Sequence, residues 1–446
     1  MMFNSLSKTF DQLKWNAANL WKYVLEQNKS VEFIKNAKFT FGTRIFAAVC
    51  GMIATVVTAR ALGPEGRGGY SVALTLSMLG AYISLLGLNA SNTHFAAKRN
   101  GFIPYYVSNN LLFSFIIGLL TILLIMIIQF FFPEFILIDN KILLTLSLLW
   151  IPLNLVNILS QSLFLGIGNV RKFNIIELIA PAIGMLGIVT LFFLRIINVE
   201  VFFFCALLGQ MFAAVLGLYY LKPFIKSFLG GLSLKLLKEN LLYGLKVLYF
   251  PSVFFFMLSG ADLLILKYFL GEEQAGYYSV ATALSSLLLL LPGAIGTLLF
   301  AKLSQTPEEH LKIAYTTKVV KWLAVLMSIT LFLSFLLAKF LIVGIFGEVY
   351  QPSVSVFIGL IPAIFFAAIS ITYLNYFSAE GRWIINTCAT AFAALMNIIL
   401  NFKVIPLLGI MGAAYVASLS QAMLLIILIL YNFFRRGSYI KHVFIK

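Results

Sequence analysis

Ionisable side chains are scarce in this chain, and the side chains that carry most enzyme chemistry are scarcer still. Charged residues make up 11% of the sequence, against about 25% in soluble domains. The three cysteines, Cys50, Cys205 and Cys388, show no CxxC spacing, so we interpret them as packing residues. The three histidines are scattered, so neither a metal cluster nor a Ser-His-Asp arrangement can be drawn. We expect no enzyme activity and no cofactor.

What the chain has instead is apolar sequence, with 61% hydrophobic residues and a mean hydropathy of +0.99. Apolar runs of about 20 residues are long enough to cross a bilayer, and they follow one another with short connections that leave no room for a soluble catalytic domain. In the first half we predict transmembrane helices at residues 42–60, 70–97, 106–132, 141–166, 173–195 and 199–221. In the second half we predict them at 247–270, 276–303, 320–346, 353–379, 383–405 and 411–434.

A short motif occurs twice along the chain, which indicates a duplication. Residues 61–73 read ALGPEGRGGYSVA, and residues 269–281 read FLGEEQAGYYSVA. In both copies Leu-Gly ends one apolar run, and Gly-x-Tyr-Ser-Val-Ala opens the next. An even number of helices in each half gives both halves the same orientation. We therefore predict an all-α membrane protein with twelve transmembrane helices in two parallel six-helix lobes around a central cavity, the architecture typical of a transporter.

The basic residues predict the orientation, because cytoplasmic loops retain an excess of Lys and Arg. Most of the 32 Lys and Arg residues fall in the N-terminal segment, the C-terminal tail and every second loop. This places both termini in the cytoplasm of a multi-pass protein of the cell (inner) membrane. The basic residues on the cytoplasmic face of the membrane account for the net charge of +16. We therefore expect no nucleic acid partner.

The same reading divides the chain into five segments. Phe3, Leu6, Phe10 and Leu13 recur at helical spacing, so the first segment is expected either to lie as an amphipathic helix on membrane lipids or to be a partly ordered tail. The segments are a cytoplasmic amphipathic N-terminal segment (1–38), an N-terminal six-helix lobe (39–221), a cytoplasmic linker (222–246), a C-terminal six-helix lobe (247–434) and a cytoplasmic basic tail (435–446).

Polar residues inside the spans are costly unless they face a cavity or each other, so they are the candidate functional residues. Arg44 opens a stripe of small and polar residues on the first span, and either lines a cavity or extends its charge to the cytoplasmic surface. Lys246 matches it in the second half, because 41–44 (FGTR) resembles 243–246 (YGLK). Asp262 is the most deeply placed acid, which indicates proton or cation coupling or a structural pair with Lys267 or Lys246.

Amide side chains form a second group of candidates. Asn154, Asn157 and Gln161 share one face of the fourth span, where they can bind sugar hydroxyls or hold helices together. Glu177 follows the basic pair Arg171-Lys172. It is interpreted as either a cavity carboxylate, with a part in coupling, or a salt-bridge partner near the loop.

Four stretches of the chain resemble the bacterial polysaccharide and O-antigen flippases of the multidrug/oligosaccharidyl-lipid/polysaccharide (MOP) exporter superfamily. The first is the hairpin TARALGPEGRGGYS at 58–71, and the similarity runs from about residue 39 to 434. The others are ADLL at 261–264 with FLG at 269–271 and AGYY at 275–278; EGR at 380–382; and NIILN at 397–401 with IP at 405–406 and GIMGAA at 409–414.

The resemblance implies a flippase that moves a polyprenyl-diphosphate-linked oligosaccharide, with a proton or sodium gradient as its energy source. It assigns Arg44 and Lys246 as cavity bases for the diphosphate and Asn154, Asn157 and Gln161 as sugar contacts. Asp262 would be the coupling or structural acid. A polysaccharide polymerase and a chain-length regulator are further partners that it suggests.

Two other functions stay open on the sequence. A cation-coupled multidrug exporter of the same fold would need an apolar cavity that contains an acid. A membrane-embedded polysaccharide polymerase or ligase would need a large extracytoplasmic loop with catalytic Arg or His, and no predicted outer loop approaches that size.

Overall fold

The computed structural model describes residues 2–131, 138–224 and 232–444; the side chains of 2–37, Asn100, Leu248 and 436–444 lie outside the description. Within these ranges the chain is helical and has no strand. The N-terminal half comprises α1 (Met2–Ser84), α2 (Leu88–Lys98), α3 (Ile103–Phe131), α4 (Lys141–Gly166), α5 (Val170–Phe193) and α6 (Val199–Leu221). The rest comprises α7 (Leu234–Gly244), α8 (Phe250–Leu288), α9 (Leu290–Ser304), α10 (Glu309–Phe346), α11 (Gln351–Ala379) and α12 (Trp383–Phe444).

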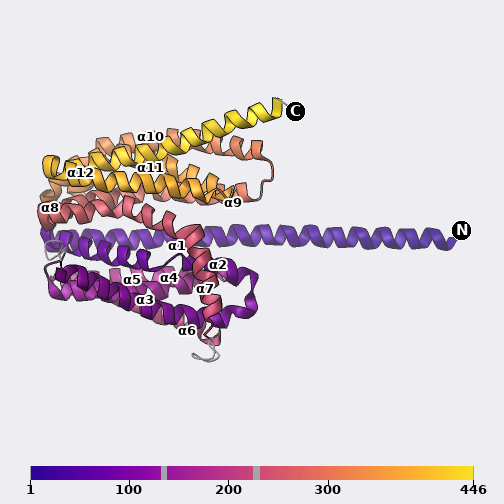
Figure 1. Cartoon of the computed structure of the whole chain (residues 1–446), viewed down its shortest axis with the longest axis horizontal. Coiled ribbons are helices and arrows are strands. Elements are labelled where there is room, and N and C mark those ends of the chain that lie inside the picture. The colour runs from indigo at the N-terminus through magenta and orange to yellow at the C-terminus, as the bar shows by residue number, and fades with distance from the viewer. Residues whose placement is uncertain (1, 132–137, 225–231, 445–446) are drawn as a thin grey trace.

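The helices form two lobes that lie side by side (Figure 1). The described part of the chain contains nine helical segments long and apolar enough to cross a membrane. Three of these, in α1, α8 and α12, are each two helices joined at a kink, which agrees with twelve spans. The protein is therefore an integral, multi-pass membrane protein.

The kinks lie at glycines and define one end of the bundle, here called the hairpin end. Gly63, Gly271 and Gly409 have φ angles of 68°, 85° and 62°, a backbone conformation that costs glycine least. The start of α1 and the end of α12 lie at the opposite end, here called the terminal end (Figure 1).

Several predicted boundaries coincide with the structure because the sequence carries strong capping signals there. The predicted spans 141–166 and 199–221 are the bounds of α4 and α6. Asn140 and Asn198 precede these helices, and their side-chain oxygens accept hydrogen bonds from the first free backbone N–H groups. The predicted span 70–97 is interrupted, because Gly87 breaks the helix with a φ angle of 74°.

The predicted linker 222–246 contains a helix that docks on the N-terminal lobe. Ser233 caps the start of α7, and its backbone exchanges hydrogen bonds with the amide of Asn109 on α3. Arg99 forms an ion pair with Glu239 on α7 at 3.0 Å. The chain then enters α8 through a π-helical turn at 245–249.

The predicted N-terminal segment 1–38 belongs to α1, which begins at Met2 and continues without a break into the first span. In Figure 1 this part of α1 extends away from the bundle at the terminal end. The prediction that this segment lies on membrane lipids concerns side chains outside the described residues, so it stays a prediction. The assignment of residues 435–446 as a cytoplasmic basic tail also stays a prediction.

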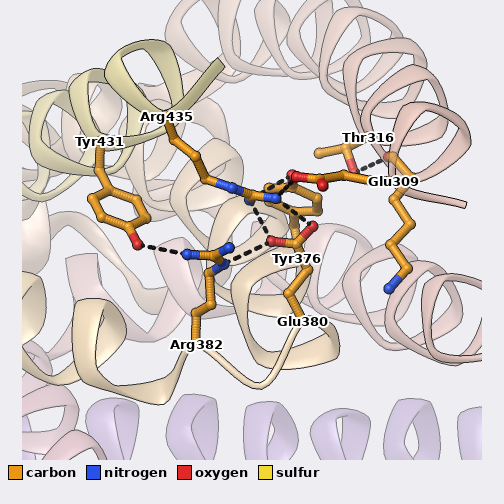
Figure 2. Close-up of polar contacts among 8 residues, drawn as sticks. Glu309, Thr316, Tyr376, Glu380, Arg382, Tyr431 and Arg435 are labelled. Atoms are coloured by element: carbon orange, nitrogen blue, oxygen red, sulfur yellow. Dashed lines mark hydrogen bonds and ion pairs between the residues drawn. The ribbon is translucent and has the colours of Figure 1, made fainter. Parts of the chain in front are cut away.

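The terminal end of the C-terminal lobe is held by a cluster of charged and aromatic side chains (Figure 2). Arg435 of α12 forms ion pairs with Glu309 of α10 and with Glu380, which follows α11. Arg382 also pairs with Glu380, at 3.3 Å, and donates a hydrogen bond to the hydroxyl of Tyr431. The cluster fixes the ends of three helices relative to one another.

Candidate functional site

The two lobes meet at the hairpin end through the two copies of the repeated motif. Gly68 and Gly276 occupy equivalent positions in the copies. A side chain at Gly68 would collide with the backbone of Glu272 and Gly276, and a side chain at Gly276 would collide with the backbone of Pro64 and Gly68. The contact is reciprocal, and both glycines are buried.

Hydrogen bonds and an ion pair reinforce this junction. Arg60 donates from Nε to the carbonyl of Ile345 at 2.7 Å and from Nη2 to that of Gly344 at 2.8 Å. The hydroxyl of Tyr350 donates to the carbonyl of Ala59 at 3.0 Å. Lys267 pairs with Asp139 at 2.9 Å. The structure is therefore closed at the hairpin end.

Below this junction lies a cavity of about 430 Å³, here called the Arg67 cavity. Its walls come from both arms of α1, from α4, α5 and α6, and from residues 283–290 of α8 and α9, so most of it belongs to the N-terminal lobe. Arg67 is the only charged residue among the described residues that line it. The other polar or aromatic lining residues are Thr55, Tyr70, Trp150, Gln210 and Ser286.

Arg67 points from the hairpin back along α1. Its side chain is buried, at 7% exposure. Nη1 donates to the hydroxyl of Thr58 at 2.8 Å and Nη2 to that of Thr55 at 3.4 Å, and the guanidinium lies 5.4 Å from the ring centroid of Tyr70. Nε has no hydrogen-bond partner among the described residues.

A second cavity of about 410 Å³ lies between the first lobe's Tyr82 and the C-terminal lobe. Tyr82 stacks on Phe256 there, with 4.9 Å between ring centroids. Among the described lining residues there is no charged side chain, and the polar ones are Ser252, Ser259, Ser378, Asn386 and Thr390.

Asp262 lies in a buried polar network of the C-terminal lobe, away from the lining of both cavities. Its carboxylate accepts hydrogen bonds from the hydroxyl of Tyr278 at 2.8 Å and from the amide of Asn401 at 2.7 Å. The Asn401 amide also donates to Asn397 at 3.1 Å. Asn397 Nδ2 and Asn401 Oδ1 have no partner among the described residues. The described ion pairs include none between Asp262 and Lys246 or Lys267.

Arg44 and Glu177 form an ion pair at 3.5 Å, with side chains 50% and 27% exposed. The pair joins α1 to α5 near the terminal end and lies outside the described lining of both cavities. Lys246 lies in the π-helical turn and is exposed. The roles of Arg44 and Lys246 in substrate binding, and of Glu177 in coupling, stay predictions.

The three amides of the fourth span lie on α4, and none lines either cavity among the described residues. Asn157 is buried and donates to the backbone carbonyl of Gln210 at 3.1 Å and to its side chain. Asn154 and Gln161 are partly buried. Asn157 thus holds α4 to α6 and positions Gln210, which does line the Arg67 cavity. A sugar contact from Asn154, Asn157 or Gln161 stays a prediction.

Sequence reasoning missed Arg67, Gln210 and the amide partners of Asp262. Arg67 lies inside the repeated motif, and no site role was predicted for it from the sequence. Asn397 and Asn401 carry a detectable signal, because their spacing of four places both on one helix face.

A closed hairpin end, two lobes of repeated design and cavities between membrane-spanning helices define a membrane transporter. Solved structures with this fold cover most of the chain at low identity. A multidrug resistance MATE transporter of the MOP superfamily, in an inward-facing conformation, matches with a TM-score of 0.71 and 14% identity over 88% of this chain and 96% of that chain. The lipid II flippase MurJ, in an inward closed conformation, matches with a TM-score of 0.67 and 18% identity. The match covers 88% of this chain and 87% of the MurJ chain.

A third structure is a MOP superfamily transporter from Pyrococcus furiosus, with a TM-score of 0.63 and 12% identity over 91% of this chain and 95% of that chain. For that transporter, the reverse polarity of its binding pocket suggests a different function. Comparison with curated proteins gave no match. The sequence model of the polysaccharide biosynthesis protein family matches residues 33–306, and the chain belongs to that family.

Proposed function

We propose that this protein is a flippase that moves a polyprenyl-diphosphate-linked oligosaccharide from the cytoplasmic to the outer leaflet of the cell membrane. The substrate is a repeat unit of an O-antigen, capsule or exopolysaccharide. Membership of the polysaccharide biosynthesis family supports the saccharide class, and the MATE and MurJ fold supports transport by alternating access.

The observation that carries the proposal is the charge of the Arg67 cavity. An exporter of organic cations needs an acid in its cavity. Here the described lining of both cavities contains an arginine and no carboxylate. Together with the aromatic walls from Tyr70 and Trp150, this lining suits a head group that carries negative charge and sugar rings. The MOP superfamily transporter from Pyrococcus furiosus is described as having a binding pocket of reverse polarity, which supports the use of pocket polarity as a criterion of function.

The proposed orientation of the protein in the membrane rests on the charge distribution. Lys and Arg concentrate toward the terminal end, so we place that end and both termini in the cytoplasm. With the hairpin end closed by Arg60, Tyr350 and Lys267, the structure represents the state closed to the outside. A polymerase and a chain-length regulator would then handle the product at the outer face.

Energy coupling is assigned to the network around Asp262. A buried carboxylate is stable when hydrogen-bond donors or a cation compensate its charge. Asn401 Oδ1, which has no partner among the residues that the structure describes, lies in the same network. The network can therefore take either a proton on Asp262 or a sodium ion bound by oxygen atoms.

The first experiment is translocation of a fluorescent polyprenyl-diphosphate oligosaccharide in proteoliposomes, scored by protection from an added glycosidase. Flipping above that of empty liposomes supports the lipid-linked glycan as substrate. Absence of flipping for several glycans, with folded protein and with export of a fluorescent organic cation, would instead support the multidrug exporter.

A further inference from the structure

A crevice of about 340 Å³, here called the α9–α10 crevice, lies between two helices of the C-terminal lobe. Its described lining consists of Ile295 of α9 and Lys318, Val319, Trp322, Leu323 and Leu326 of α10. None of these residues belongs to the described lining of the two cavities above. The crevice is therefore separate from the candidate substrate site.

Charged and apolar groups are separated along the crevice. Both α9 and α10 have one end at the terminal end, where the chain passes from one to the other (Figure 1). Leu326 lies about 12 Å further along α10 than Lys318, at 1.5 Å per residue. Lys302, in the last turn of α9, has its ammonium nitrogen 5.5 Å from the ring centroid of Tyr315, one turn before Lys318. The crevice is thus basic toward the terminal end and apolar further in.

The two lysines have no carboxylate that compensates their charge. Lys302 and Lys318 are exposed, and none of the ion pairs in the described part of the chain includes either of them. The acids that lie between them in the sequence, Glu308 and Glu309, form ion pairs with other residues. Two ammonium groups are therefore available to an anion at the same end of the crevice.

Trp322 indicates how deep in the membrane the crevice lies. Its side chain is 69% exposed, one turn after Lys318. Exposed tryptophans of membrane proteins concentrate at the level of the lipid head groups. Further along α10 the exposed side chains are apolar, as at Ile329 and Phe332. The basic end of the crevice therefore lies at the head groups, and its apolar part lies among the acyl chains.

We propose that the α9–α10 crevice binds one acidic phospholipid, with its phosphate on Lys302 and Lys318 and one acyl chain along Ile295, Val319 and Leu326. Two uncompensated lysines complement the net negative charge of such a lipid, whereas a zwitterionic lipid brings a positive group of its own. In the proposed orientation the lipid belongs to the cytoplasmic leaflet. The site does not depend on the proposed flippase function.

A polyprenyl diphosphate has the same general chemistry, an apolar tail and a phosphate group. The position of the crevice favours the phospholipid, because the head group of the proposed substrate has to enter a cavity between the helices. The residues around the crevice lie outside the described lining of both cavities. A membrane phospholipid can occupy the crevice throughout transport without entering either cavity.

Binding is tested with the purified full-length chain in detergent, titrated with phosphatidylglycerol and separately with phosphatidylcholine of the same acyl chains. Native mass spectrometry counts the bound lipids. We expect one phosphatidylglycerol to bind about tenfold or more tightly than phosphatidylcholine. Lys302→Gln combined with Lys318→Gln should weaken phosphatidylglycerol binding by about tenfold or more and leave phosphatidylcholine binding unchanged.

The matched control combines Lys339→Gln with Lys403→Gln. These lysines are also exposed in the C-terminal lobe but lie toward the hairpin end, so this variant loses the same charge and should bind as the wild type does. If the Lys302 and Lys318 double variant is not monodisperse, Lys318→Gln alone replaces it, with an expected loss of about fivefold.

The position of the lipid is tested with phosphatidylglycerol that carries brominated acyl chains, which quench a nearby indole. The quenching should be smaller in Trp322→Phe than in the wild type. Ile295→Phe narrows the crevice and keeps both lysines, so it should weaken binding and reduce the quenching.

Equal affinity for the two lipids, or unchanged phosphatidylglycerol binding in the lysine variant, would overturn the proposal. Unchanged binding and quenching in Ile295→Phe would also overturn it, because the lysines would then attract lipid without the crevice. Displacement of phosphatidylglycerol by an equal concentration of polyprenyl diphosphate would assign the crevice to the substrate instead. Binding of phosphatidylglycerol as expected, with no flipping of any glycan, would retain this site and reject the proposed function.

Discussion

Two arginines of α1, Arg44 before the kink at Gly63 and Arg67 after it, meet different electrostatic conditions. Arg67 is buried, and among the described residues it has no carboxylate partner. Arg44 is half-exposed and paired with Glu177 at 3.5 Å. Exposed pairs of this kind contribute about 0 to 1 kcal/mol to stability, so a substitution at Arg44 tests function with little effect on folding.

Arg44→Ala is expected to abolish translocation and leave expression intact, because the residue stands where the diphosphate would enter from the cytoplasm. Flipping in proteoliposomes and the yield of monodisperse protein are the two measurements. Arg99→Ala is the matched control, since it breaks an exposed Arg–Glu ion pair of the same kind, with Glu239, away from the predicted site residues. If Arg44→Ala retains transport and expresses poorly, its role is structural.

Asp262→Asn is expected to make transport independent of the ion gradient, because the variant keeps the side-chain volume and loses the charge that a proton or sodium ion would compensate. Flipping is measured with an imposed pH gradient and with an imposed sodium gradient. Ser259→Ala, one turn earlier on α8, should respond to the gradient as the wild type does. Unchanged gradient dependence in Asp262→Asn would eliminate the coupling role.

At the scale of elements, the helix ends of the C-terminal lobe depend on Glu380. Its side chain is 6% exposed and contacts both Arg435 and Arg382 (Figure 2). The cluster ties α10, α11 and α12 together at the terminal end.

Glu380→Gln should therefore lower stability by about 2 kcal/mol, the usual magnitude for hydrogen bonds to charged groups. The measurement is the melting temperature of the purified protein in detergent. Glu308→Gln is the control, because Glu308 is 56% exposed and pairs only weakly with His310. An equal change in both variants would show that the cluster adds no stability.

Sequence patterns predict elements where local signals decide them. Runs of apolar residues that begin after Asn140 and Asn198 define α4 and α6, because the cap is local. The partners of Asp262 could not be predicted from spacing alone, since Asn401 lies on a helix far along the chain. Arg67 was not predicted as a site residue for a related reason. Residues 64–69 continue as helix after Gly63, and the buried position of the Arg67 side chain depends on the packing of that helix.

At the scale of the whole molecule, an ion pair joins the two lobes at the hairpin end. This pair can form only while the two lobes are close together there. Lys267 and Asp139 lie 2.9 Å apart, with side chains 10% and 77% exposed. Among the described ion pairs this one alone joins a lysine to a carboxylate. A carbodiimide can convert such a pair into an amide bond.

Carbodiimide treatment is expected to cross-link the lobes and stop transport, because alternating access requires the hairpin end to open. The cross-link is detected on a denaturing gel after cleavage at a protease site placed between the lobes. Lys267→Arg preserves the ion pair but cannot form the amide, so this variant should keep its activity. Loss of transport in both proteins would point to other modified carboxylates and contradict the prediction.

The reciprocal contact between Gly68 and Gly276 has a further meaning for the origin of the molecule. Each lobe presents the same small surface to the other, which is the isologous geometry of a twofold dimer. A half-length ancestor could have assembled with a second copy of itself through this one glycine. The two copies differ at the position just before these glycines, where one has Arg67 and the other has Ala275.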